Sequence, residues 1–459
     1  MATEYSIRES KVDWITIGLY LIIVVLGWLN LYSTSSSIDP SYINFNSYHG
    51  KEAVFLIASF GLGIFVLFMD TKFVEFVSFI YYGLCMVALV AVLFVSKVSG
   101  AASWFEIGGV KIQPTEFAKV ATLMALAKFM SRYNFSLKNR QDLLTVLGIV
   151  FLPMVLVLAQ NDAGSALVFC SLILVFYREG LHPLILLGLL LLVMVGFISL
   201  VFSAEKWLPL YLGVPLVLLA GASYWYIFRR RFITWHIVGL LFMVSIPFTA
   251  TKVVKDYQSA RFRVLVASNA DIKKDDALKK VHYNYIQALV AVGSGKVWGK
   301  GFGKSTHTRA NFVPEEHTDY IHCVFGEEHG FVGSTVLLLL FFLLVVRVIY
   351  VAENSKTVYA RVFGYGAASI LIVHVVVNIG MSIGVVPTIG IPLPFFSYGG
   401  SSVIAFSLML FIMMNHYSYR TNILSSGSSF SGGGNTRGGF TPPVRTPASS
   451  APKDSNFKH

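Results

Sequence analysis

Charged residues are scarce in this chain of 459 residues. Asp, Glu, Lys and Arg make up 13% of it and hydrophobic residues 55%, whereas an ordinary soluble domain carries about 25% charged residues. A soluble core cannot bury this much apolar surface, so a soluble enzyme and a disordered protein are both excluded. The apolar runs are long and unbroken, which excludes a membrane β-barrel. We predict an all-α, polytopic helical membrane protein.

Cysteine is equally scarce. The three cysteines, Cys85, Cys170 and Cys323, lie far apart in apolar or loop contexts. We interpret them as packing residues rather than as disulfide partners.

Acidic residues are outnumbered, and the formal net charge is +12. In a membrane protein such an excess indicates loops that face the cytoplasm and anionic lipid, so we expect membrane lipid and no nucleic acid as a partner. The short loops of one side carry most of the Lys and Arg residues, which predicts cytoplasmic N- and C-termini.

About twelve segments are predicted to span the membrane. They are residues 13–33, 52–69, 74–96, 114–131, 142–159, 163–178, 183–203, 208–227, 232–250, 329–351, 358–386 and 397–416.

These spans divide the chain into three parts. A cytoplasmic N-terminus, 1–12, precedes a transmembrane domain, 13–423, and the Ser-, Gly- and Pro-rich tail 424–459 is predicted to be a disordered cytoplasmic segment. Within the transmembrane domain, 251–328 is predicted to be a large extracytoplasmic loop.

Four polar clusters fall on the predicted outer side, at 100–116, 160–165, 283–319 and 387–402. Loops held by a rigid scaffold often carry function, so their convergence predicts one site. ATP is absent from this side, and a lipid-linked sugar pyrophosphate is an activated substrate that a membrane supplies. A transporter is the alternative, although it would place ionisable groups nearer the bilayer midplane.

The run 293–305 (GSGKVWGKGFGKS) is rich in glycine and lysine. Trp298 stands where both a Walker A motif and a dinucleotide fingerprint need glycine. The run can still offer N–H groups and cations to a pyrophosphate, with a solvated loop as the alternative. No metal site is predicted, since His317, Asp319 and His322 lack a convincing ligand shell. No cofactor is certain, and a divalent cation bridging a pyrophosphate and a carboxylate stays open.

Motifs in these clusters resemble those of the SEDS family of peptidoglycan glycosyltransferases. They are Gln113-Pro114-Thr115-Glu116 with Lys119, Asn161-Asp162-Ala163-Gly164-Ser165, Gly293-Ser294-Gly295, Gly299-Lys300-Gly301, Pro314-Glu315-Glu316-His317-Thr318-Asp319, Pro392-Leu393-Pro394 and Ser397-Tyr398-Gly399-Gly400-Ser401-Ser402.

Within the family, Gly299-Lys300-Gly301 and Phe312-Val313-Pro314 are more similar to the elongation (RodA-type) branch. Phe395-Phe396-Ser397 leans toward the division (FtsW-type) branch, which is the second interpretation. The chain departs from the family at Ser103, where Arg is usual. The segment from about 204 to 250 is predicted to be an extra helical pair relative to the family's ten spans.

The resemblance implies an enzyme of the bacterial cytoplasmic membrane that polymerises glycan strands. The growing glycan would pass from undecaprenyl pyrophosphate to the 4-hydroxyl of an incoming lipid II, in cell elongation and shape maintenance. A class B penicillin-binding protein, a transpeptidase, is the implied partner. A lipid II flippase is the alternative function.

Asp319 occupies the position that implies the catalytic base, with a helix cap as the alternative role. The other candidate residues are assigned to substrate binding or support of the site: Trp104, Glu116, Lys119, Asp162, Arg261, Arg263, Gln287, Lys300, Lys304, His317, Ser397, Gly399 and Gly400.

Overall fold

The computed structural model describes residues 12–35, 47–95, 103–107, 110–181 and 256–428, the last range without 266, 268–271, 273–274, 309, 311 and 314. The predicted spans 183–203, 208–227 and 232–250, and with them the extra helical pair, lie outside the described residues.

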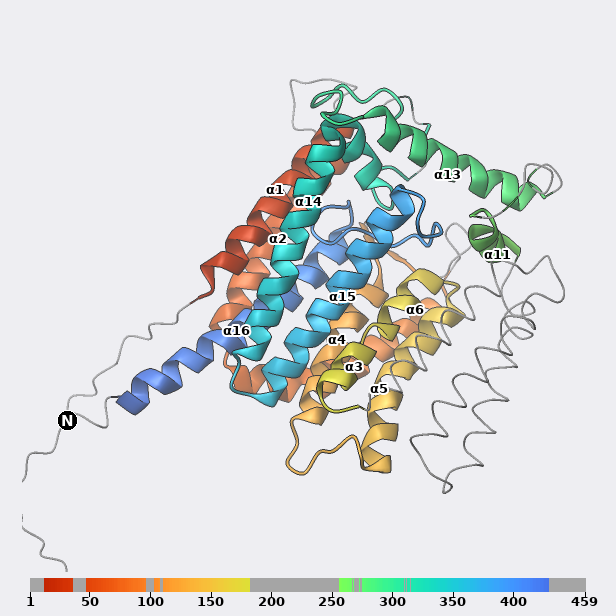
Figure 1. Cartoon of the computed structure of the whole chain (residues 1–459). Helices are drawn as coiled ribbons and strands as arrows, with labels where there is room; N and C mark the ends of the chain where they lie inside the picture. Colours follow the sequence, from red (N-terminus) through yellow and green to blue (C-terminus); the bar gives the residue numbers. More distant parts are fainter. Residues whose placement is uncertain are drawn as a thin grey trace, which may run out of the picture.

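The described part is a helical bundle with one two-stranded antiparallel sheet (Figure 1). Its elements are α1 (Trp14–Ser35), α2 (Tyr48–Phe68), α3 (Thr71–Val92), β1 (Phe105–Ile107), β2 (Val110–Ile112), α4 (Pro114–Met130), α5 (Arg140–Ala159), α6 (Ala163–Cys170), α7 (Ile173–Arg178), α11 (Asp256–Arg263), α13 (Asp276–Ser294), α14 (Ile321–Glu353), α15 (Val358–Ser382) and α16 (Gly400–Ser428).

Seven of these helices are long and apolar enough to cross a membrane, namely α1, α2, α3, α5, α14, α15 and α16. The prediction of a polytopic helical membrane protein is therefore confirmed. The predicted spans 114–131 and 163–178 correspond to the shorter α4 and to the pair α6 and α7.

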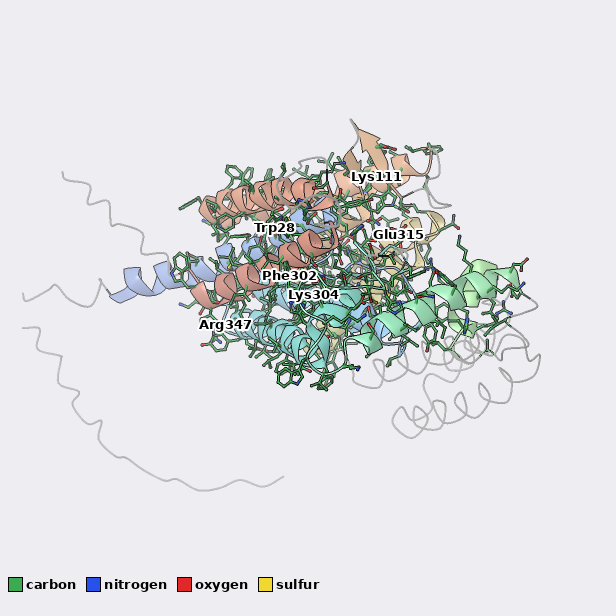
Figure 2. All side chains as sticks on the ribbon, turned by 90° about the horizontal axis from the view of Figure 1, so that it is seen from above. Trp28, Lys111, Phe302, Lys304, Glu315 and Arg347 are labelled. Atoms are coloured by element: carbon green, nitrogen blue, oxygen red, sulfur yellow. The ribbon has the colours of Figure 1, made fainter. Side chains whose placement is uncertain are left out.

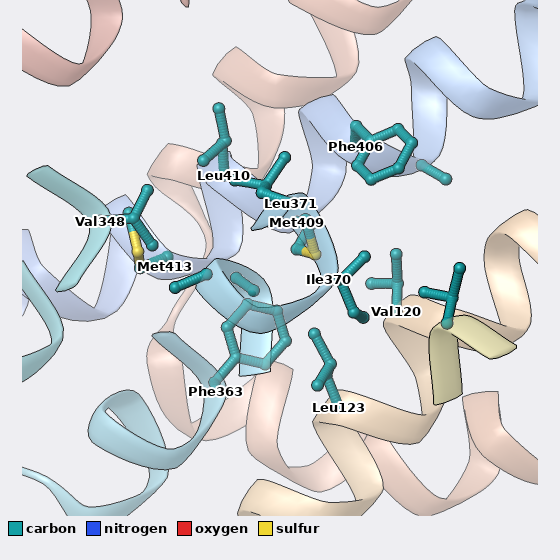
Figure 3. Packing of buried hydrophobic residues seen from close by; sticks show 14 of the residues in the cluster. Val120, Leu123, Val348, Phe363, Ile370, Leu371, Phe406, Met409, Leu410 and Met413 are labelled. Carbon is teal, nitrogen blue, oxygen red and sulfur yellow. The ribbon is translucent and has the colours of Figure 1, made fainter. Parts of the chain in front are cut away.

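The core lies where α15 packs against α4, α14 and α16. Phe363, Ile370 and Leu371 of α15 are buried against Leu123 of α4 and Met409 of α16 (Figure 3). By contrast, α2, α3 and α5 expose most of their apolar surface, as expected of helices that face lipid rather than water. The protected centre of the bundle is therefore formed by α4 together with α15 and α16.

The helix α14 begins at Ile321, eight residues before the predicted span 329–351. Its first turns contain Glu327 and Glu328, which lower the mean hydropathy of this segment but are buried inside the protein. Gly330 breaks the helix with φ 65° and ψ −161°. The apolar run found in the sequence is thus only the part of α14 beyond this kink.

The C-terminal end of α16 also differs from the prediction. The helix α16 continues to Ser428, past residue 424 where the disordered tail was predicted to begin. The remainder of that tail, 429–459, lies outside the described residues.

Helix α13 lies across the end of the bundle that carries Asp319 (Figure 1). It packs on α11 through Ala260, Leu278 and Val281. Seen from above, α13 and the β1–β2 hairpin with Lys111 lie on different sides of that end (Figure 2).

Candidate active site

Asp319 directly precedes Tyr320, the N-cap residue of α14. Its backbone carbonyl accepts a hydrogen bond of 2.9 Å from Asn378 Nδ2. The same amide nitrogen donates to the carbonyl of Ile391 at 2.8 Å. One buried side chain of α15 therefore joins the loop of Asp319 to the loop that precedes α16.

Two further hydrogen bonds join these loops. Ser397 Oγ donates to the carbonyl of Thr318 at 2.6 Å, and the N–H of Tyr398 donates to the carbonyl of His317 at 2.9 Å. Ser397 was predicted to contact substrate, and the structure places its hydroxyl against the backbone beside Asp319 instead. Its substrate role stays a prediction.

The carboxylate of Asp319 faces Gly390 and Arg261. Gly390 has φ +81°, and a Cβ on it would lie 3.1 Å from Asp319 Oδ2 and 3.9 Å from Arg261 Nη1. That Nη1 also donates to the carbonyl of Ile389 at 2.9 Å. The structure therefore brings Asp319 and Arg261, both predicted from sequence, to one glycine.

Burial raises the pKa of Asp319 to about 7. The negative charges of Glu315 and Asp162 raise this pKa further, while the positive charge of Arg261 lowers it. A carboxylate with a pKa near neutrality can both accept and release a proton under physiological conditions.

His317 lies between α1 and α2. Its Nδ1 is 3.2 Å from Thr34 Oγ1, and its ring lies 4.3 Å from that of Tyr48. Burial lowers the pKa of His317, so the imidazole is neutral at pH 7. Next to it, burial raises the pKa of Glu316 to about 7, and the charge of Glu327 adds to this.

Asp162 caps α6 by accepting the N–H of Ser165 at 2.9 Å. Its second oxygen accepts from Gln113 Nε2 at 3.1 Å. The backbone N–H of Gln113 in turn donates to Ser401 Oγ at 3.0 Å. Three of the polar clusters therefore meet through side-chain contacts.

Glu116 and Lys119, three residues apart on α4, form an ion pair, with Lys119 Nζ 2.8 Å from Glu116 Oε1. Lys119 Nζ also lies 3.0 Å from His374 Nε2, while His374 Nδ1 lies 2.8 Å from the carbonyl of Pro392. Only a protonated Nδ1 can donate to that carbonyl, so Nε2 accepts from the lysine. This buried series of hydrogen bonds, from Glu116 to the carbonyl of Pro392, supports the loop that contains Pro392.

Several N–H groups of the glycine- and lysine-rich run donate to carbonyls within the protein. The N–H groups of Lys300 and Gly301 donate to the carbonyls of Glu327 and Glu328 at 3.0 and 2.9 Å. At Gly299, with φ +81°, a Cβ would lie 2.1 Å from the carbonyl oxygen of Glu328. These glycines let one backbone approach another.

Lys300 has a structural partner as well. Its Nζ lies 2.6 Å from Oε1 of Glu327, whose side chain is fully buried. Glu327 also accepts the N–H groups of Thr306, His307 and Thr308. The assignment of Lys300 to a pyrophosphate stays a prediction, and its observed role is to neutralise this carboxylate.

The remaining candidates are more dispersed. Arg263 pairs with Asp275, the N-cap of α13, at 2.6 Å. Lys304 is exposed, whereas Gln287 and Trp104 are half-buried.

Gly399 and Gly400 lie at the entry to α16. The N–H of Gly399 donates to the buried Glu52 at 3.2 Å, and a Cβ on Gly400 would lie 2.7 Å from the ring of Phe55. Both contacts are with α2, so these glycines seat α16 against α2. Their assignment to substrate stays a prediction.

Asn378, Glu327 and Gly390 were not assigned to the site from sequence. The first two are polar residues within apolar stretches, which is the signal that marks them. Within the described ranges, no group of three or more His, Cys, Asp and Glu residues could hold a metal ion.

The sequence matches the cell cycle protein family of FtsW, RodA and SpoVE over residues 13–211 and 207–422. The chain belongs to this family. It is 33% identical to the peptidoglycan glycosyltransferase MrdB of Escherichia coli K12, over 75% of this chain and 79% of that protein. It is 29% identical to the peptidoglycan glycosyltransferase RodA of Treponema pallidum, over 86% of this chain and 94% of that protein.

Solved structures agree with this membership. A chain from a peptidoglycan synthase complex has a TM-score of 0.63 at 25% identity, covering 89% of this chain and 98% of that one. RodA of Thermus thermophilus has a TM-score of 0.57 with the same identity and coverage. The protein is a RodA-type enzyme of the SEDS family, a multi-pass membrane glycosyltransferase of peptidoglycan synthesis.

Proposed function

We propose that this chain polymerises lipid II on the outer face of the bacterial cytoplasmic membrane, with both termini in the cytoplasm. The growing glycan on undecaprenyl pyrophosphate is transferred to the 4-hydroxyl of an incoming lipid II, during cell elongation. The observation that carries this proposal is the carboxylate of Asp319, half-buried beside Arg261 with a pKa of about 7.

In this mechanism Asp319 is the general base. It accepts the proton of the 4-hydroxyl while the hydroxyl oxygen attacks the anomeric carbon of the growing strand. The bond from that carbon to the pyrophosphate oxygen breaks, and the pyrophosphate leaves as an anion without needing a protonating acid. A positioned base of matched pKa contributes about 10²–10⁴-fold to such a step.

Arg261 is assigned to the charge that develops on the leaving pyrophosphate. Its guanidinium and the carboxylate of Asp319 both lie next to Gly390. A cation at this position stabilises the departing anion. The transfer itself needs no resident cofactor. A divalent cation, if it takes part, arrives with the pyrophosphate as part of the substrate.

We further propose a class B penicillin-binding protein as partner. The similarity to a chain from a peptidoglycan synthase complex supports this. Polymerisation and cross-linking would then act on the same strand in succession.

Polymerisation of labelled lipid II by the purified protein in bilayers tests the proposed function. Glycan strands separated by size are the expected product. A flippase would move lipid II between leaflets without forming strands, and this result would overturn the proposal. Asp276→Asn, the same chemical change at an exposed residue of α13, is the matched control for Asp319→Asn.

A further inference from the structure

The loop from Lys296 to Lys304 presents apolar side chains on its surface. Trp298 is 80% exposed, Val297 52% and Phe302 49%. In the view from above, Phe302 and Lys304 lie over the side of the molecule formed by α1 and α14 (Figure 2). Neither the fold nor the proposed transfer reaction uses these three apolar side chains.

The loop is fixed to α14 by its backbone. The N–H groups of Phe331 and Val332 donate to the carbonyls of Lys296 and Val297 at 2.9 and 3.1 Å. On the other side of the Gly330 kink, the loop is held by Glu327. These contacts therefore fix the position of Trp298 relative to α14.

At this position Trp298 adjoins the end of the lipid-facing surface of α14. Phe331 is 68% exposed, Val336 50% and Leu339 53%, all on the membrane-spanning part of this helix. The exposed apolar side chains of the loop extend this apolar surface of α14 past the kink at Gly330. Trp at the end of an apolar span is typical of a membrane interface, where its ring meets the headgroups.

The charges of the loop fit the same environment. Lys296 and Lys304 are exposed, and neither ammonium has an ion-pair partner in the part of the chain that the structure describes. Lys300, between them, is instead paired with Glu327. Two of the three lysines are thus available to anions at the level of Trp298.

We propose that the loop Lys296–Lys304 is a lipid-binding surface. Trp298, Val297 and Phe302 enter the membrane interface at this end of the bundle, and Lys296 and Lys304 bind the phosphates of anionic phospholipids. This assignment goes beyond glycosyl transfer and does not depend on it. It gives the lysines that flank Lys300 a lipid partner in place of the substrate.

Quenching of tryptophan fluorescence by brominated lipids tests the assignment. The protein is reconstituted in bilayers with brominated phosphatidylglycerol or brominated phosphatidylcholine. The chain has seven tryptophans, so the signal of Trp298 is the difference between wild type and Trp298→Phe. We expect both lipids to quench this difference signal, and the anionic lipid to do so at lower mole fraction, by roughly fivefold per lysine at low salt.

Variants separate the two parts of the proposal. In the double variant Lys296→Gln, Lys304→Gln the preference for the anionic lipid should disappear while quenching remains. Lys280→Gln removes one exposed cation at the far end of α13 and should keep the preference. Moving the reporter by Phe302→Trp in the Trp298→Phe protein should reproduce the wild-type preference.

Two results would overturn the proposal. If acrylamide in water quenches the difference signal but neither brominated lipid does, the loop faces solvent or awaits a protein partner. If both lipids quench equally and the lysine variants change nothing, the loop does not bind anionic headgroups.

Discussion

Replacing Asp319 by Asn removes a base while leaving the backbone in place. The side chain does not cap α14, since the N-cap is Tyr320 and makes no side-chain cap hydrogen bond. The contact that holds this residue is made by its backbone carbonyl with Asn378. We therefore expect the melting temperature to be nearly unchanged and polymerisation to fall by about 10²–10⁴-fold.

The pH dependence gives an independent check. Only the deprotonated carboxylate accepts a proton, so the wild-type rate should fall as the pH decreases through about 7, the pKa of Asp319. Glu315→Gln removes a negative charge that raises this pKa, so the acidic limb should move to lower pH. Arg261→Gln removes a positive charge that lowers it, so the limb should move to higher pH.

The assay is initial-rate polymerisation of labelled lipid II between pH 5 and 9, with the melting temperature of each variant recorded alongside. Opposite shifts for Glu315→Gln and Arg261→Gln would identify the titrating group as one that both side chains face. Wild-type rates for Asp319→Asn would refute the assignment of the base. So would a low melting temperature with normal turnover, which is the signature of a helix cap.

Three other substitutions test the supports of the site. Gly390→Ala should abolish most activity, because its Cβ would lie 3.1 Å from the carboxylate of the proposed base. The control is Gly180→Ala: Gly180 also has a positive φ, +103°, but a Cβ there would have no atom within 4 Å, so polymerisation should be kept. Asn378→Leu leaves two backbone carbonyls without their donor, so calorimetry should show a loss of about 1–3 kcal/mol together with slower turnover. Lys119→Met leaves Glu116 buried and unpaired, which should lower the stability by about 3–5 kcal/mol; adding Glu116→Gln should restore much of it, as judged by thermal unfolding.

Hydropathy predicted the fold because lipid-facing helices must be apolar along most of their length. It placed the start of α14 too late, since Glu327 and Glu328 are buried by protein and not by lipid. A window average cannot distinguish these two environments. The same reasoning missed the continuation of α16 to Ser428, whose last residues are polar.

The site was predicted in part. The candidate residues Asp319 and Arg261 do approach one glycine, and Glu116 and Lys119 do pair, as their spacing of three suggests. The partner of Lys300 was not predictable, because Glu327 lies 27 residues away in the chain and no local spacing pattern links the two. Spacing predicts contacts within one helix, whereas contacts between loops depend on the tertiary fold.

The supports of Asp319 explain how its carboxylate stays available for chemistry. Carbonyls of three successive residues, 317 to 319, accept hydrogen bonds from Tyr398, Ser397 and Asn378. These bonds fix the backbone and use none of the oxygens of the carboxylate. A side chain held by its own hydrogen bonds would have a lowered pKa and would be a weaker base. Positioning through the main chain therefore gives Asp319 a fixed location together with a pKa near neutrality, the combination that proton transfer from a sugar hydroxyl requires.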